Sequence, residues 1–299
     1  PQKPAQHVLG QAALRFAPEV AVVNDDAIMD SYMSVKLLGS VGGPTVVFLA
    51  ERAEGASVQF APYPKLLALK VFRRAAPGSE QRALQNERIS AEVNYAKRFE
   101  REVGVKIYFV GVSEDRVSIA MEAGKELPTR LPFARYPLES RMLHSLGVAD
   151  KVAWLEAQGV LHGDLRLDHI RMKRDGAPAL VDFGTARELA AGPGQTDIWS
   201  LGALIYTMAF EGHEPAAMTD RAAAGAWPDL QEDPRYLATM RIAERDPTGD
   251  FRERMAMTQR QSWLRTLLGL LSDMLGRDAP QQVTAGQAAT RLQALVEEL

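Results

Sequence analysis

The chain contains no cysteine, and its apolar runs are short. Without cysteine there can be no disulfide framework, no thiolate metal site and no cysteine nucleophile. Apolar stretches such as residues 201–210 are about half the roughly 20 residues that a membrane-spanning helix needs, so we expect no membrane span. The first residues show no basic segment followed by an apolar one, and we therefore expect no cleavable signal peptide.

An excess of basic charge is also missing. The net charge is −3 and the isoelectric point is near 6.0. Proteins that follow the phosphates of nucleic acids usually carry a basic field, so nucleic acid is not an expected partner. The chain has 299 residues, of which 46% are hydrophobic, and this is enough to form a large packed core in one domain or two lobes.

Strand patterns fill the first half of the chain, and helical patterns fill the second. Residues 35–51 and 105–122 are apolar and β-branched around a turn, which predicts two hairpins, and residues 65–72 predict a further strand. Residues 79–103 carry apolar side chains at helical spacing. The later candidate helices are 138–158, 196–211, 217–225, 259–275 and 284–298. Strands followed by helices predict an α+β fold with segregated layers.

The same pattern predicts how the domains are arranged. Residues 1–30 are mixed in character and contain three prolines, so we expect an N-terminal extension that is either packed on the domain or partly disordered. A small β-rich lobe should cover residues 31–122, and a larger helical lobe should cover 123–299.

Two acidic elements carry the chemical signal, HGDLRLDHI at 162–170 and VDFG at 181–184. Each of Asp164 and Asp182, taken alone, could be a turn or cap residue. Together, at the ends of short apolar stretches, they suit a metal–phosphate site. One carboxylate can hold a divalent ion on phosphates, and the other can orient an attacking hydroxyl and accept its proton.

These elements resemble the H-R-D-L-x-x-x-N catalytic loop and the D-F-G motif of the protein-kinase family. The resemblance implies ATP as the phosphate donor, Asp164 as the catalytic base and Asp182 as a magnesium ligand. Arg166 takes the place of a lysine that usually touches the transferred phosphate. His169 takes the place of an asparagine that holds a second metal. Because imidazole prefers softer ions than Mg²⁺, we name Mn²⁺ as an alternative.

A second resemblance lies in the first half, where LALK at 67–70 is similar to the family's third-strand V-A-I-K. It implies that Lys70 binds the α- and β-phosphates and pairs with a helix glutamate, for which Glu92 is the first candidate and Glu87 the second. SIAME at 118–122 looks like the end of the fifth strand, with Met121 behind the adenine. The remaining candidates for ATP contact are Gly39, Gly42, Gly43, Val47, Ala68, Glu122 and Ala123.

The helical half adds a supporting residue and several departures. TDIWSLGALIYTM at 196–208 looks like the family's long buried helix, whose Asp197 would support the catalytic loop. Gly163 replaces an arginine that commonly reads a phosphate, and Gln282 replaces an arginine that pairs with the family's A-P-E motif. That motif is absent, and the stretch from Asp182 to Asp197 is about half the usual length. The resemblance therefore implies that the phosphate-binding arginine, the A-P-E motif with its arginine partner and a full-length loop are all absent.

These departures resemble the reduced kinases that bacterial pathogens inject into host cells. The resemblance implies an atypical serine/threonine-protein kinase acting as a virulence effector. Its partners would be a protein substrate, with a host protein as one candidate, and a candidate activating partner. Its expected location is the cytoplasm, or a host cell reached without a cleavable signal peptide.

Two other functions stay open. The chain could be a pseudokinase that binds nucleotide and serves as a scaffold, because His169 is unusual at a metal position. It could also be a small-molecule kinase, because H-G-D at 162–164 is common in aminoglycoside- and choline-kinase-like families.

A kinase that lacks the phosphate-binding arginine and the A-P-E motif should be active without phosphate on its own loop. We expect mass spectrometry of purified active enzyme to find no phosphate within residues 185–196 on which activity depends. Treatment with a phosphatase should leave the activity unchanged. Activity that disappeared with a phosphate in this segment would contradict regulation of this reduced kind.

Overall fold

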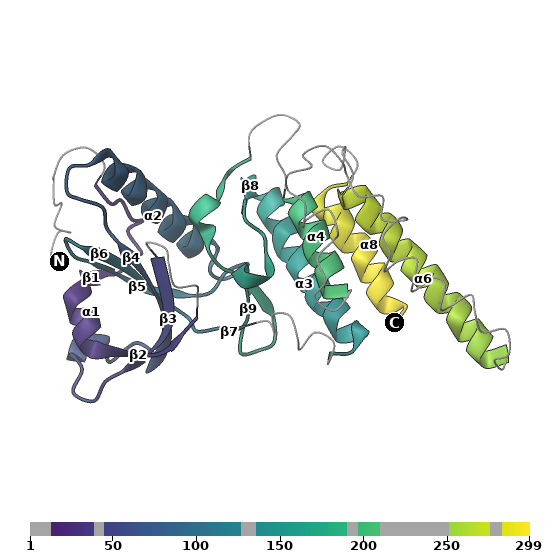
Figure 1. Cartoon of the computed structure of the whole chain (residues 1–299), viewed down its shortest axis with the longest axis horizontal. Coiled ribbons are helices and arrows are strands. Elements are labelled where there is room, and N and C mark those ends of the chain that lie inside the picture. The colour runs from purple at the N-terminus through teal and green to yellow at the C-terminus, as the bar shows by residue number, and fades with distance from the viewer. Residues whose placement is uncertain (1–12, 39–44, 127–135, 190–196, 210–250, 276–282) are drawn as a thin grey trace. The chain divides into compact units, whose positions relative to one another are not determined.

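The computed structural model describes residues 13–38, 45–126, 136–189, 197–209, 251–275 and 283–299. The chain is an α+β protein with a β-sheet in its N-terminal region and helices after it (Figure 1). It forms two compact units. The first comprises residues 1–125, 171–175 and 179–186, and the second comprises residues 126–170, 176–178 and 187–299. Within the described ranges, no helix has the length and apolar character needed to span a membrane.

The first unit is built on a six-stranded sheet with the order β1-β5-β6-β4-β3-β2. Neighbouring strands are antiparallel except β1 and β5, which are parallel. The predicted strands and both hairpins are present. The strands are β1 (Val22–Asn24), β2 (Tyr32–Leu37), β3 (Thr45–Arg52), β4 (Leu66–Arg73), β5 (Ile107–Val112) and β6 (Arg116–Met121). A short 3-10 helix, η1, covers Val58–Phe60.

The sequence did not predict β1 or the helix α1 (Asp25–Ser31) that follows it. Both lie in the stretch expected to be an extension, and from residue 13 onward this stretch is packed on the unit. A three-residue strand is too short to show an alternating pattern. The N-cap of α1 is Asn24, whose side chain accepts a hydrogen bond from the Asp26 N–H at 2.8 Å.

Helix α1 lies tightly against β5 at Gly111. A Cβ atom there would collide with the end of the Ile28 side chain and would lie 2.8 Å from Asp25 Oδ1. The buried Asp25 carboxylate accepts a hydrogen bond from Arg116 Nε at 2.8 Å, and Asp26 accepts another from the same guanidinium at 2.9 Å. The missing side chain of glycine and this pair of ionic bonds therefore fix α1 on the sheet.

Helix α2 (Glu80–Phe99) packs on one face of the sheet (Figure 1). Its N-cap Ser79 accepts from the Arg82 N–H at 3.2 Å. The helix was predicted to run to residue 103 but ends at Phe99. The carbonyl of Phe99 accepts from the N–H groups of Val103 and Gly104 at 3.0 and 2.9 Å, which closes a turn instead of extending the helix.

The second unit contains four described helices that pack on one another: α3 (Leu138–Ala157), α4 (Ile198–Ala209), α6 (Phe251–Leu275) and α8 (Ala285–Glu297). Each was predicted, although α6 begins earlier than expected. The predicted helix at 217–225 lies outside the described residues. Thr284 and Gln287 form a capping box at the start of α8, and the Ala285 N–H donates to Glu156 of α3 at 2.7 Å.

Short elements complete the described fold. The 3-10 helices η3 and η4 cover Leu167–His169 and Phe183–Thr185. Five short strands form two small sheets with the orders β10-β9-β7 and β11-β8. They are β7 (Lys125–Glu126), β8 (Val160–Leu161), β9 (Ile170–Met172), β10 (Pro178–Leu180) and β11 (Arg187–Glu188).

The contact at Gly111 predicts a stability difference between two glycine substitutions. Gly111→Ala should lower the free energy of unfolding by about 1–3 kcal/mol, because the new methyl group forces α1 away from β5. The control is Gly269→Ala in α6, where nothing lies within 4 Å of the added Cβ. It should raise stability by up to about 1 kcal/mol through helix propensity. Urea unfolding curves measure both, and equal effects would contradict this packing.

Candidate functional site

A buried lysine held between two carboxylates forms the centre of the candidate site. Lys70 lies in the middle of β4, paired with Val47 of β3 on one side and Ile119 of β6 on the other. Its Nζ lies 2.6 Å from Glu92 Oε1 of α2 and 2.9 Å from Asp182 Oδ1. All these residues belong to the first unit. The pair that the sequence suggested, Lys70 with Glu92, is thus present, and the second candidate, Glu87, is exposed on α2.

Strand alternation explains why Lys70 reaches α2. Ala68, Lys70 and Phe72 share one face of β4, and Phe72 belongs to the core cluster that packs on α2. The Lys70 ammonium lies 5.1 Å from the centre of the Phe72 ring, a distance that permits a cation–π contact. The lysine stem is therefore embedded among apolar side chains, and only its charged end meets the carboxylates.

The three charges differ in how far water can reach them. Lys70 and Glu92 expose only 7% and 6% of their surface, whereas the Asp182 side chain is 37% exposed. Burial works against the charged ammonium, but the Glu92 and Asp182 carboxylates outweigh it and hold the pKa of Lys70 above its usual value. Lys70 is therefore a cation at neutral pH.

For Glu92 the effect of burial is larger than the effect of the neighbouring charges. Burial raises the pKa of Glu92, the Lys70 ammonium opposes this effect, and the nearby Asp182 charge adds to it. The site holds two carboxylates and one ammonium, so its ionised form has an excess negative charge. This excess lies beside Asp182, which is the carboxylate open to solvent.

Asp182 has an unusual backbone conformation. Its φ is 66° and its ψ is 67°, and among the described residues it is the one non-glycine residue with a positive φ. Such a conformation costs about 1–2 kcal/mol and persists where neighbouring contacts enforce it. The next side chain, Phe183, is buried against Phe99 of α2, with ring centres 6.3 Å apart. A Cβ atom on Gly184 would lie 3.2 Å from Asp182 Oδ1 and 3.3 Å from Glu92 Oε2, so glycine lets both carboxylates approach.

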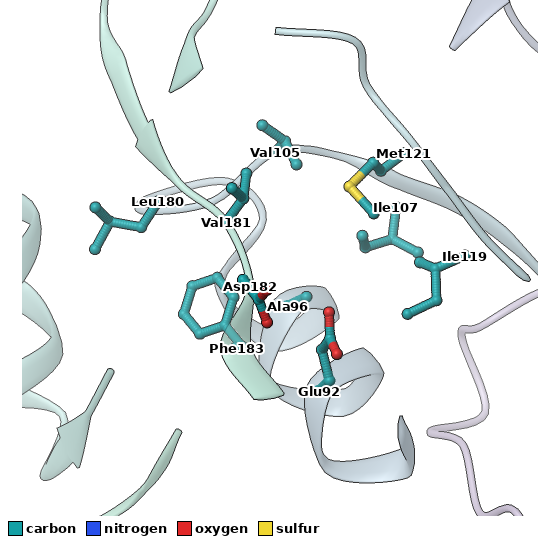
Figure 2. A pocket seen from close by; sticks show the side chains of 10 residues that line it. All are labelled: Glu92, Ala96, Val105, Ile107, Ile119, Met121, Leu180, Val181, Asp182 and Phe183. Carbon is teal, nitrogen blue, oxygen red and sulfur yellow. The ribbon is translucent and has the colours of Figure 1, made fainter. Parts of the chain in front are cut away.

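Figure 2 shows a pocket beside these carboxylates, formed by α2, β5, β6 and the segment around Asp182. Its lining is apolar except for Glu92 and Asp182. The sequence predicted three of the lining residues, Glu92, Met121 and Asp182. The others could not be identified from the sequence, because they fit an ordinary pattern of hydrophobic core residues. The lining residues are Glu92, Ala96, Val105, Ile107, Ile119, Met121, Leu180, Val181, Asp182 and Phe183.

The residues predicted to meet adenine lie where β6 ends. Met121 is paired with the buried Ala68 of β4. The Glu122 N–H donates to the carbonyl of Lys106 at 2.8 Å, and the Glu122 carbonyl accepts from the Gly124 N–H at 3.1 Å. The backbone N–H and carbonyl of Glu122 are therefore both engaged in hydrogen bonds within the protein. The predicted phosphate-loop residues Gly39, Gly42 and Gly43 lie outside the described residues.

The predicted catalytic loop belongs to the second unit and is held by Asp197. The two oxygens of this buried carboxylate accept from the N–H groups of His162 and Gly163, at 2.6 and 2.9 Å. The sequence predicted this supporting role. The φ of Gly163 is 81°, a conformation that glycine adopts without strain.

Asp164 and His169 form a second contact within this loop. The Nδ1 atom of His169 lies 2.8 Å from the Asp164 carbonyl oxygen and 3.4 Å from Asp164 Oδ2. Because a carbonyl oxygen can only accept, Nδ1 of His169 is the donor in the contact with Asp164. Arg166 is exposed and donates to Asp168 at 2.6 Å. The Asp164 carboxylate is itself about half exposed.

The described residues show no metal site formed by protein side chains alone. Across the described ranges, no group of three or more histidine, aspartate or glutamate side chains is arranged to hold an ion. Mg²⁺ commonly binds through one or two carboxylates together with substrate phosphates, so such a group is not required. Of the two predicted metal ligands, the Asp182 side chain is 37% exposed and the His169 side chain is 14% exposed.

The buried pair predicts a pH-dependent loss of stability. Lys70→Met should destabilise the protein by about 3–5 kcal/mol near neutral pH, because it leaves Glu92 buried without its cation. Between pH 8 and pH 5 the wild-type lysine stays charged, since its pKa is raised above 10.5. Glu92 in the variant takes up a proton as the pH falls toward the usual glutamate value of 4.5. The destabilisation should therefore be smaller at pH 5 than at pH 8.

The matched control is Lys65→Met, which removes an exposed lysine paired with the exposed Glu51 at 2.8 Å. It should change stability little and show no trend with pH. Urea unfolding of the three proteins at both pH values measures the effect. A Lys70→Met destabilisation that is equal at pH 5 and pH 8 would contradict the charge balance described for Glu92.

Comparison with known proteins gives limited support for a family. No family model matches the chain. An alignment of 178 positions, which covers 50% of the chain, is 31% identical to a Saccharomyces cerevisiae protein named "Putative serine/threonine-protein kinase YPL150W". The match covers 19% of that protein, so the chain spans about a fifth of the relative's length. The chain is thus similar to part of a kinase-like protein, and this similarity supports a kinase-like family at most.

Proposed function

We propose that the chain is an ATP-dependent phosphotransferase with a two-lobed protein-kinase-like fold. We further propose that it transfers the γ-phosphate to serine or threonine hydroxyls of a protein. The observation that carries the proposal is the buried Lys70 between Glu92 and Asp182. A lysine that is desolvated, kept charged and fixed in direction is suited to bind phosphate oxygens. The partial similarity to the yeast protein points the same way.

The charge balance of this site supports a metal–nucleotide ligand. Lys70 would contact phosphate oxygens, and Asp182 would hold the divalent ion that accompanies them. Two carboxylates around one ammonium leave negative charge at the open end of the site, which a cation neutralises. When bound, Mg²⁺ or Mn²⁺ would neutralise charge on the phosphates. Glu92 would act through Lys70 by fixing the direction of its ammonium.

The segment 162–170 of the second unit would carry the residues that activate the acceptor hydroxyl. Asp164 would orient the substrate hydroxyl and accept its proton as the oxygen attacks the γ-phosphorus. Asp197 holds the two N–H groups just before Asp164, and His169 holds the Asp164 carbonyl. Arg166, which is exposed on the same loop, would meet the transferred phosphate.

We also propose that the enzyme is not regulated by phosphorylation of its own loop and that it belongs to the reduced, effector-type kinases of bacteria. Gly163 supports this idea because it offers no guanidinium to a phosphate. The Asp197 contacts already satisfy two N–H groups of the catalytic loop, so the loop is held without such a phosphate. Within the segment 185–196, residues 190–196 lie outside the described residues.

A nucleotide-binding scaffold without catalysis is the second candidate. His169 favours it, because this imidazole stands where the resemblance implies a metal-binding asparagine, and its Nδ1 is engaged by the Asp164 carbonyl. A small-molecule kinase would have the same phosphate site with a different acceptor. The acceptor therefore has to be tested together with the catalysis.

We expect Asp164→Asn to separate these functions. With γ-labelled ATP and Mg²⁺ or Mn²⁺, the wild type should label protein serine or threonine residues and leave a panel of metabolites unlabelled. Asp164→Asn should lower turnover by about 10²–10⁴-fold, as expected for loss of a general base, with nucleotide binding by thermal shift retained. Labelling of a metabolite instead would identify a small-molecule kinase.

Asp115→Asn is the matched control, because this carboxylate is exposed in the turn between β5 and β6. It should leave turnover unchanged. Equal turnover of Asp164→Asn and wild type would exclude Asp164 as the base. Nucleotide binding without any transfer in the wild type would favour the scaffold.

A further inference from the structure

Residues 13–20, here called the arm, run along helix α2 and are bonded to its side chains. The Arg15 N–H donates to Ser90 Oγ at 2.9 Å. The Asn94 amide binds the arm twice. Its Oδ1 accepts from the Ala17 N–H at 2.8 Å, and its Nδ2 donates to the Arg15 carbonyl at 3.0 Å. A single asparagine thus pairs with the backbone of the arm much as a neighbouring strand would.

The arm contacts the side of α2 that faces away from Glu92. Successive residues of an α-helix are about 100° apart around its axis, since there are 3.6 residues in each turn. Ser90 and Asn94 are each two residues from Glu92, and so each lies about 200° from it. The helix is therefore held on one side by the arm and on the opposite side by the ion pair with Lys70.

Apolar contacts strengthen the same attachment. Leu14, Phe16 and Ala17 of the arm pack against a core cluster to which α2 contributes Ile89 and Val93. Val20, at the end of the arm, is itself a buried member of this cluster. The remaining members come from the sheet, so the arm lies where helix and sheet meet. They are Phe72, Ile107, Val110, Val117 and Ile119.

The far end of the arm is fixed to the sheet. The Val110 N–H donates to the carbonyl of Ala21 at 2.8 Å, and β1 then pairs with β5. Beyond β1, Asp25 is bonded to Arg116 of β6 at 2.8 Å. The arm is therefore a tie between the sheet and α2. Lys70 belongs to the sheet and Glu92 belongs to α2, so the tie spans the same two elements as the ion pair.

We propose that the arm positions α2 for nucleotide binding, with Ser90 and Asn94 as positioning residues that act through Glu92. When the arm is detached, α2 is free to move from the sheet, and Glu92 then no longer fixes the Lys70 ammonium. This proposal rests on the proposed function, because it assigns the Lys70–Glu92 pair to the binding of ATP. The arm would then couple whatever binds or displaces it to the nucleotide site.

A double-mutant cycle tests this coupling. Asn94→Leu removes both asparagine bonds and keeps the number and branching of the side-chain heavy atoms. Its Kd for Mg–ATP should be about threefold to tenfold higher than that of the wild type, the effect expected for one or two hydrogen bonds. In a Glu92→Gln background the same substitution should change the Kd little, because the residue through which it acts is already altered. An equal rise in both backgrounds would overturn the proposal, since it would indicate general loosening of the fold.

Two further variants calibrate the result. Asn94→Asp keeps an acceptor for the Ala17 N–H and loses the donor to the Arg15 carbonyl, so its Kd should lie between those of wild type and Asn94→Leu. Arg88→Ala removes an exposed side chain of α2 and should leave the Kd unchanged. A Kd shift for Arg88→Ala as large as that for Asn94→Leu would count against a role for the arm.

Hydrogen exchange without nucleotide separates this proposal from the proposed function. Backbone amides of residues 80–99 should exchange faster in Asn94→Leu than in wild type and Arg88→Ala, while amides of β4 keep their protection. Unchanged exchange in α2 would overturn the positioning role even if the protein binds ATP. If the wild type does not bind ATP, the proposed function fails, and the exchange rates alone decide whether the arm holds α2.

Discussion

The charge of Lys70 is the constraint on which the first unit depends. A buried ammonium is tolerated only when carboxylates compensate for its lost hydration. Here one carboxylate comes from α2 and the other follows β10, so the sheet, the helix and the segment at Asp182 must meet at one point. The left-handed backbone of Asp182 and the glycine at 184 are both consistent with this requirement.

The strand, the helix and the segment at Asp182 cannot shift independently without breaking the contacts of Lys70. If α2 shifts, Glu92 loses its cation inside the protein, and the cost is that of an uncompensated buried charge. The sheet side is anchored by Lys70 in the centre of β4, which is bonded to β3 and β6. In our proposal the helix is the element that would move, and the bonds from the arm to Ser90 and Asn94 would oppose that movement.

Hydrophobic periodicity is a short-range signal, and it was sufficient to predict strands β2 to β6 and the main helices. The Lys70–Glu92 pair was predicted from the resemblance to the kinase family. The sequence did not predict α1, β1 or the attachment of the arm. These depend on contacts between distant residues, such as Asn94 with Ala17 and Asp25 with Arg116, which leave no pattern in either segment. The end of α2 was also missed, since residues 100–103 have helical character and yet close a turn on the Phe99 carbonyl.

In the predicted catalytic loop of the second unit, as at Lys70, a buried charge is satisfied by several partners. The loop's N–H groups at His162 and Gly163 point to one buried carboxylate, so leaving Asp197 unpaired would cost more than the loop could gain by rearranging. His169 adds a bond to the Asp164 carbonyl from within the same loop. In the proposed enzyme these bonds would hold the loop without an external phosphate. Control of the enzyme would then come from the position of α2.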